Sequence, residues 1–330
     1  MKNLIEGSAL IALLSLLSCT KLVYTNLHRN QSMDAKPQAL SNTKMNDSAK
    51  NIYYRLNASY PDTANAPTPL QNGFAHNDYI HSRPLYEALE NGFTNIEADI
   101  FLVKGKLIVA HVCPYFKGKR TLEALYLEPL LARITKNNGK VYAGYNVPVT
   151  LMIDIKTNAD NTYKALKSVL EKYRPVLSSY ENGVLVNRAV TIVISGHKPF
   201  ELIKMEKSRL AFIDKDLLEI SSEPVSDHVY NMASCKYSTL INWNGNTAIP
   251  SSEKKKLCDL VAKAHKIGAR VRLWASPEKK EVWDELLRCG VDLINTDELV
   301  TLKNYLTERR FQLAAANDLK LAYTDVVSID

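Results

Sequence analysis

The chain has 330 residues, of which 46% are hydrophobic and 8% aromatic, so it can form one large folded core. Its 42 basic and 35 acidic residues leave a net charge of +7, and six of the basic residues fall within residues 20–56. No basic stripe with interleaved aromatic side chains is present, which argues against a nucleic-acid partner.

Residues 1–19 predict an export signal. A mostly apolar run from Ala9 to Leu17 follows Lys2, and it is too short to span a bilayer. The sequence Leu16-Leu17-Ser18-Cys19 resembles a bacterial lipoprotein signal, in which Cys19 would carry the lipid and become the mature N-terminus. We therefore expect an exported protein anchored to a membrane, in the periplasm or at the cell surface. An ordinary secretory signal with a coincidental cysteine is the alternative.

Residues 20–70 are rich in Asn, Ser, Thr, Lys and Pro and show little periodic hydrophobicity. This composition is typical of a flexible linker, which would hold a lipid-anchored domain away from the membrane.

From residue 71 to residue 310, strand-like apolar runs alternate with helix-like runs. The predicted strands are Gly73–His76, Thr94–Leu102, Thr150–Ile155, Val190–Ser195, Leu210–Ile213, Thr239–Asn242, Arg270–Trp274 and Leu293–Asn295. The predicted helices cover residues 83–91, 121–136, 160–173, 199–207, 253–266 and 278–289. This alternation predicts a (β/α)8 TIM barrel, followed by a C-terminal extension over residues 311–330. A doubly wound open sheet is the alternative, but it would normally contain a Gly-rich phosphate turn, which is absent.

The segment "NIEADIFLVKGKLIVAH", residues 95–111, has the pattern of a buried β-hairpin with a turn at Lys104-Gly105-Lys106. Alternate residues of a strand point to the same face, so Glu97 and Asp99 lie side by side in an apolar strand. Two such carboxylates 4 Å apart repel by about 4 kcal/mol at an effective dielectric constant near 20. This arrangement predicts a cation between them, and a divalent ion is the simplest candidate. A half-exposed strand with a solvated polar face is the alternative.

In a TIM barrel the chemistry gathers at the C-terminal ends of the strands, where this sequence concentrates polar residues. Asp154 supplies a third carboxylate, and oxygen ligands of this kind suit Mg²⁺ or Ca²⁺. His76 and His111 lie at the same end and could supply one base and one acid. Lys156 adds a positive charge. A metal, a lysine and two histidines together suit the cleavage of a phosphodiester.

These segments resemble a known superfamily. "GFAHNDY", "EADIFLVKGKLIVAH", "LMIDIK" and "GVDLINTD" are similar to the PLC-like phosphodiesterases with a TIM barrel, which include glycerophosphodiester phosphodiesterases, phosphatidylinositol phospholipases C and sphingomyelinase D. "RPLYEALENGF" and "RTLEALYLEPLL" resemble the altered-inheritance-of-mitochondria branch and its bacterial relatives. The resemblance covers about residues 73–300.

The resemblance implies a metal-dependent phosphoric diester hydrolase that acts on glycerophosphodiester or phospholipid-type substrates. It implies His76 and His111 as the catalytic pair, and a metal site made of Glu97, Asp99 and Asp154. Lys156 and Trp274 would line the phosphate and substrate pocket.

Further contacts and departures from the family pattern concern the substrate. Asn77 stands where the family often has Arg, and we expect it to lie beside the substrate. We also expect a substrate contact from His197, which follows the fourth predicted strand. Val112 stands where an Asp commonly follows the second family histidine. These departures affect the expected substrate more than the expected reaction.

Other functions are compatible with the same residues. One alternative is a non-catalytic surface lipoprotein that binds phosphorylated ligands on the barrel. Another is a TIM-barrel enzyme such as an aldolase, with Lys156 as a Schiff-base lysine. The head group, the choice of metal, a linear or cyclic phosphate product and the oligomeric state stay open.

The cysteines match no zinc pattern. Although Cys113, Cys235, Cys258 and Cys289 could pair after export, we expect mostly buried free thiols, because a chain of this length does not need a disulfide framework.

Overall fold

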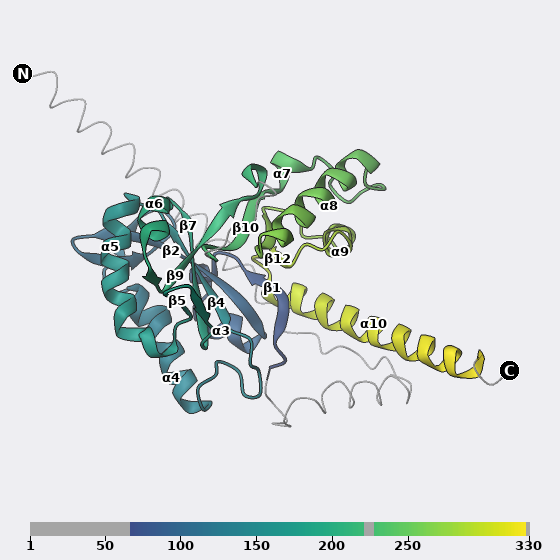
Figure 1. The fold of residues 1–330 in the computed structure, drawn as a ribbon, viewed down its shortest axis with the longest axis horizontal. Coiled ribbons are helices and arrows are strands. Elements are labelled where there is room, and N and C mark those ends of the chain that lie inside the picture. The colour runs from purple at the N-terminus through teal and green to yellow at the C-terminus, as the bar shows by residue number, and fades with distance from the viewer. Residues whose placement is uncertain (1–66, 221–227, 328–330) are drawn as a thin grey trace, which may run out of the picture. The chain divides into compact units, whose positions relative to one another are not determined.

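The computed structural model describes residues 67–220 and 228–327, and its central element is a closed barrel of parallel strands (Figure 1). The strands follow one another in the order β1-β12-β11-β10-β9-β7-β4-β2, and β1 also pairs with β2, which closes the ring. The predicted TIM barrel is therefore confirmed. The barrel strands are β1 (Leu70–Ala75), β2 (Phe93–Val103), β4 (Val149–Ile155), β7 (Val190–Gly196), β9 (Ala211–Asp216), β10 (Tyr230–Lys236), β11 (Arg270–Trp274) and β12 (Leu293–Thr296).

Helices connect the strands and cover the outside of the barrel (Figure 1). In α8, for example, Leu257, Val261 and Ala264 are buried at helical spacing. The α-helices are α3 (Tyr86–Glu90), α4 (Glu128–Lys136), α5 (Ala159–Leu170), α6 (Phe200–Met205), α7 (Tyr237–Leu240), α8 (Ser251–Lys266), α9 (Lys280–Arg288) and α10 (Leu299–Val327). Short 3-10 helices are η1 (Asp78–Ile80), η2 (Pro114–Phe116), η4 (Glu171–Val176) and η5 (Leu217–Glu219), and η3 (Glu123–Leu127) is a short π-helix.

From the sequence we expect the barrel domain to end at residue 310. The α10 helix continues past that residue without a break. No helix in the described part of the chain combines the length and apolar character needed to cross a membrane.

Shorter strands lie beside the barrel. β3 (Lys106–Val109) pairs antiparallel with β2, as predicted, and the two-residue turn between them places Lys104 and Gly105 at φ 48° and 76°. A separate three-stranded sheet consists of β5 (Ser179–Glu181), β6 (Val184–Val186) and β8 (Ser208–Arg209).

The predicted sixth strand at Thr239–Asn242 is wrong. This segment overlaps α7 and the residues after it, and the true strand β10 lies earlier, at Tyr230–Lys236. The sequence "YNMASCK" mixes polar and small residues and lacks the β-branched residues that usually identify a strand. Its burial comes from its neighbours β9 and β11.

Side chains fill the barrel interior in layers. At the bottom, the Arg270 guanidinium donates hydrogen bonds to Asn95 and Thr150 at 2.9 and 2.8 Å. Above it lies an apolar layer formed by one buried residue from each of five strands, namely Phe74, Met152, Val193, Met232 and Leu293.

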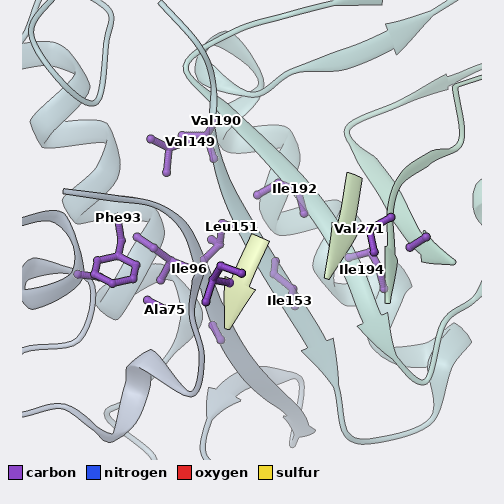
Figure 2. Close-up of a cluster of buried hydrophobic side chains, with 14 of the residues drawn as sticks. Ala75, Phe93, Ile96, Val149, Leu151, Ile153, Val190, Ile192, Ile194 and Val271 are labelled. Carbon is purple, nitrogen blue, oxygen red and sulfur yellow. The ribbon is translucent and has the colours of Figure 1, made fainter. Parts of the chain in front are cut away.

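The alternate residues of the same strands point outward. Leu151 and Ile153 of β4 and Ile192 and Ile194 of β7 belong to the apolar cluster between strands and helices (Figure 2). Asp154, one residue beyond Ile153, therefore faces the barrel axis at the top of the apolar layer.

The expectation of mostly free thiols is wrong, because Cys113, Cys258 and Cys289 are disulfide-bonded. Cys258 of α8 and Cys289, which follows α9, form a disulfide across 31 residues of sequence. The pairing depends on the packing of two neighbouring helices, which residue spacing alone does not reveal. Cys235 is a buried free cysteine.

Candidate active site

A pocket with a volume of about 690 Å³ lies at the C-terminal ends of the barrel strands. It brings together eight of the site residues predicted from the sequence: His76, Asn77, Glu97, Asp99, His111, Asp154, Lys156 and Trp274. His197 does not line this pocket, and its imidazole Nδ1 lies within hydrogen-bond distance of the Thr157 carbonyl, at 2.9 Å. Cys19 lies outside the described residues.

Three carboxylates meet on one wall of the pocket. Glu97 and Asp99 share the inner face of β2, and Asp99 is the direct neighbour of Asp154 on β4. One oxygen from each of the three lies within 4.8 Å of the other two. Asp99 Oδ1 is buried and has no hydrogen-bond partner, and Asp154 Oδ1 is buried beside the Lys156 ammonium. Converging carboxylates with a buried, unpartnered oxygen suit a hard divalent cation.

A glycine leaves the space that the third carboxylate occupies. A Cβ at Gly196 would lie 2.0 Å from Asp154 Oδ1 and 2.6 Å from the Ile155 carbonyl. Gly196 also has a φ of +68°, which favours glycine. The end of β7 therefore holds a glycine because the Asp154 carboxylate fills the place of a side chain.

Two cationic side chains partly neutralise the three acids. Lys156 Nζ lies 3.1 Å from Asp99 Oδ2 and 3.2 Å from Asp154 Oδ1. Arg272, which is buried, places Nη1 3.1 Å from Glu97 Oε2. Burial raises the pKa of Asp154 to about 6 against the opposing charge of Lys156, and the charges of Asp99 and Glu97 act in the same direction as burial.

His76 is held by a carboxylate from the last strand of the barrel. Its Nδ1 lies 2.8 Å from Asp297 Oδ1, and its Nε2 lies 3.8 Å from Glu97 Oε2. Burial alone would lower the pKa of His76, but the hydrogen bond to Asp297 and the charges of Glu97 and Asp297 outweigh it and raise the pKa. Asp297 thus orients the ring and favours its protonated form.

Asp297 is itself positioned by Glu278. The Glu278 carboxylate accepts hydrogen bonds from the Asp297 amide at 2.9 Å and from the Thr296 hydroxyl at 2.8 Å. Burial raises the pKa of Glu278. Glu278 lies between β11 and α9, so this connecting segment supports the Asp297 carboxylate that holds His76.

His111 stands at the end of the β2–β3 hairpin with its side chain 56% exposed. Its Nδ1 lies 2.8 Å from Tyr79 Oη and 3.2 Å from Asp99 Oδ2. Because Nδ1 is occupied in both histidines, each ring has Nε2 available for proton transfer.

Four residues of this network were not among the site residues predicted from the sequence, namely Tyr79, Arg272, Glu278 and Asp297. Asp297 was visible as the last residue of "GVDLINTD", but its pairing with His76 bridges 221 positions. Tyr79 lies three residues after His76, and no local pattern marks its hydroxyl as part of the site.

The far half of the pocket is formed by β7, β9, β10 and β11. Asp214 is buried there and accepts a hydrogen bond from the Ser195 hydroxyl at 3.2 Å. Trp274 is 38% exposed, and Lys236 Nζ lies 5.7 Å from the centre of its ring system. These side chains enclose space next to the acids and histidines, where the non-reacting part of a substrate would fit.

Comparison with known proteins links this site to phosphodiesterases. Residues 65–214 match the model of the AIM6-like phosphodiesterase domain, and residues 270–299 match the glycerophosphoryl diester phosphodiesterase family. Both matched segments contain residues of the pocket.

The chain is also similar to proteins named Altered inheritance of mitochondria protein 6. It is 29% identical to that of Eremothecium gossypii over 70% of this chain and 68% of the relative. It is 25% identical to that of Lachancea thermotolerans over 68% of this chain and 63% of the relative. For the Arthroderma benhamiae homolog the identity is 25%, with coverage of 72% and 84%. The chain thus matches about two thirds of the length of the first two relatives.

Among solved structures, a glycerophosphodiester phosphodiesterase from Parabacteroides distasonis aligns with a TM-score of 0.45 and 16% identity. The alignment covers 74% of this chain and 98% of that protein.

Proposed function

This chain belongs to the PLC-like phosphodiesterase superfamily with a TIM barrel, as its motifs predicted, and from that premise we propose that it is a metal-dependent phosphoric diester hydrolase. We propose glycerophosphodiester or phospholipid-type compounds as its substrates. The observation that carries the proposal is the convergence, in one pocket, of three carboxylates within 4.8 Å of one another and two histidines with available Nε2 atoms.

Glu97, Asp99 and Asp154 would hold the divalent ion, either Mg²⁺ or Ca²⁺. When bound, the ion would supply positive charge to the phosphoryl oxygens of the diester. The donor set fits such an ion, because all three ligands are carboxylates and one of their oxygens, Asp99 Oδ1, is buried without a partner. Lys156 adds a fixed positive charge at the same edge of the pocket.

His76 and His111 would move the protons of the reaction. A hydroxyl oxygen, from water or from the substrate itself, attacks phosphorus and loses its proton to one imidazole Nε2. The bond from phosphorus to the leaving oxygen breaks, and that oxygen takes a proton from the other imidazole. Asp297 and Tyr79 keep the rings turned so that Nδ1 is occupied and Nε2 is available.

A substrate screen tests the proposal. The purified protein is incubated with glycerophosphodiesters, lysophospholipids, sphingomyelin, phosphatidylinositol and bis-p-nitrophenyl phosphate, each with Mg²⁺, Ca²⁺ or EDTA. We expect turnover that needs a metal and that falls at least about a hundredfold in His76→Ala and in His111→Ala. His265→Ala is the matched control, because His265 pairs with Asp292 outside the pocket. Binding of these compounds without turnover would instead favour a non-catalytic lipoprotein.

We also propose export and a lipid anchor at Cys19. The support is the leader sequence of residues 1–19 and the Cys258–Cys289 disulfide, since disulfides persist mainly outside the cytoplasm. The protein should incorporate labelled fatty acid and partition with membranes, and Cys19→Ser should abolish the labelling. Release of the unmodified wild type without any lipid would contradict the anchor and leave only secretion.

A further inference from the structure

The hydroxyl of Tyr79 contacts three polar side chains of the site. Its Oη lies 2.7 Å from Asp99 Oδ2, 2.8 Å from His111 Nδ1 and 2.5 Å from the Asn77 side-chain amide. The phenol is buried, with Tyr79 only 4% exposed. One hydroxyl therefore joins a proposed metal ligand, a proposed proton-transfer group and the loop that follows His76.

Counting protons determines the direction of these bonds. A phenol has one proton to donate and two lone pairs that accept. The ionised Asp99 carboxylate and the Asn77 amide oxygen can only accept, so the Tyr79 proton goes to one of these two oxygens and not to His111. The Tyr79 oxygen must then accept from His111, and His111 must carry its proton on Nδ1.

The Asn77 amide completes the same network. The Asn77 amide oxygen lies 2.5 Å from the Tyr79 phenol oxygen, and the Asn77 NH2 group donates to Asp297 Oδ1 at 3.4 Å. The phenol proton thus has two oxygen acceptors to choose from, Asp99 and Asn77. With either acceptor the phenol oxygen accepts from Nδ1–H of His111.

The His111 ring needs such a partner, since it stands at a hairpin end with more than half of its side chain exposed. The shorter of its two hydrogen bonds is the one to Tyr79, and the two rings stack with an interplanar angle of 23°. Tyr79 is fixed in turn, because Arg120 donates a hydrogen bond to its backbone carbonyl at 2.5 Å.

We propose that Tyr79 is a positioning residue that holds His111 with Nδ1–H turned away from the pocket, so that Nε2 faces the substrate. The catalytic meaning of this inference rests on the proposed function. The orientation of the ring can be measured without any substrate, so the two can fail separately.

Tyr79→Phe is the test variant, because it removes the hydroxyl and keeps the ring that stacks on His111. Tyr126→Phe is the matched control. Tyr126 is also a buried tyrosine that donates to an aspartate, at 2.9 Å from Asp78 Oδ2, but it does not line the pocket. Loss of a buried hydroxyl is thus common to both variants, and only Tyr79→Phe removes a partner of His111.

The kinetic measurement is a double-mutant cycle. Loss of a group that orients a catalytic ligand typically costs about 10–100-fold, so we expect Tyr79→Phe to lower kcat by about that factor with little change in KM. In a His111→Ala background the same substitution should cost less than about threefold, because the ring that Tyr79 holds is gone. In a His76→Ala background it should cost its full factor. Equal costs in the His111→Ala and wild-type backgrounds would overturn the proposal.

The second measurement is the ¹⁵N spectrum of the histidine rings in the full-length protein with Mg²⁺, at a pH where they are neutral. The His111 signals are identified by their absence in His111→Ala. We expect the Nδ1–H tautomer in the wild type and in Tyr126→Phe, and a mixture with the Nε2–H tautomer in Tyr79→Phe. An Nε2–H tautomer in the wild type, or an unchanged tautomer in Tyr79→Phe, would overturn the proposal even if no substrate is turned over.

Discussion

Asp297 Oδ1 lies 2.8 Å from Nδ1 of His76, although 221 positions separate the two residues in the sequence. The contact exists because β1 and β12 are neighbours in the barrel, with Ala75 paired to Thr296. It joins the first and the last strand at the point where both end. The closure of the barrel thereby orients one of the two histidines on which the proposed reaction depends.

Asp297→Asn should impair turnover without unfolding the protein. The amide keeps the size of the side chain but removes the charge that favours protonated His76, so kcat should fall by about 10–100-fold. The control is Asp292→Asn, which alters another Asp–His pair, at 2.8 Å from His265, outside the pocket. Turnover within about threefold of wild type in Asp297→Asn would show that His76 does not depend on this partner.

The acidic triad should reveal its metal in thermal melting. An ion at a hundred times its Kd stabilises the folded state by about 2.7 kcal/mol, which corresponds to about 5–10 °C in a chain of this size. We expect Mg²⁺ or Ca²⁺ to raise the melting temperature of the wild type by about that amount, and to raise that of Asp154→Asn much less. Asp160→Asn, which changes an exposed aspartate at the start of α5, is the charge-matched control.

In EDTA the order of stability should change. Asp154→Asn removes one of three clustered like charges, so the metal-free variant should melt at or above the temperature of the metal-free wild type. If EDTA changes neither the melting nor the activity of wild type, and elemental analysis finds no metal, the three acids form an ion network with Lys156 and Arg272 instead.

Gly196→Ala should damage the site more than its backbone cost predicts. An alanine at a φ of +68° costs about 1–2 kcal/mol, and the new methyl group would also collide with the Asp154 carboxylate. Gly268→Ala is the matched control, since Gly268 has a φ of +75° and no atom within 4 Å of the new Cβ.

Both glycine variants should lose similar stability from the backbone, but only Gly196→Ala should also lose the metal-dependent rise in melting temperature and most of its turnover. Equal metal responses in the two variants would mean that Asp154 does not need this space.

The sequence was sufficient to predict the barrel and much of the site, because both depend on local patterns. Alternation in β2 placed Glu97 and Asp99 on one face, and the predicted turn at Lys104-Gly105-Lys106 is present. β10 could not be predicted in the same way, because its burial depends on β9 and β11 rather than on its own composition.

The residues that hold the site together were harder to predict for a related reason. Tyr79 reaches Asp99 and His111 over 20 and 32 positions, and Arg272 reaches Glu97 over 175. Such pairs form only when the ring of strands closes. Sequence patterns therefore located the groups that would react, whereas the folded barrel was needed to identify the groups that orient them.

Asp78 links the loop that carries His76 and Tyr79 to the rest of the protein. Its Oδ2 accepts hydrogen bonds from the Leu85 amide at 2.6 Å and from the Tyr126 hydroxyl at 2.9 Å, and its Oδ1 is buried without a partner. Burial raises the pKa of Asp78 to about 6, although both hydrogen bonds oppose the shift. The folded protein therefore holds the Asp78 proton more tightly than the unfolded chain, in which an aspartate has a pKa near its ordinary value of about 3.9.

The sign of the pH dependence follows from this difference. Ionised Asp78 costs stability, and the cost grows as the pH rises from the unfolded pKa to the folded pKa and is fully present above about pH 6. Asp78→Asn removes that cost, because an amide does not ionise, while its oxygen can still accept from Leu85 and Tyr126. Between pH 5 and pH 8 the stability of Asp78→Asn should therefore improve relative to wild type by about 1 kcal/mol, from 1.36 kcal/mol per pKa unit. Urea unfolding of both proteins at several pH values measures this difference in the free energy of unfolding. The contributions of the other titrating groups are the same in both proteins and cancel. A difference that stays constant, or that shifts in favour of wild type as the pH rises, would show that Asp78 is ionised in the fold at little cost.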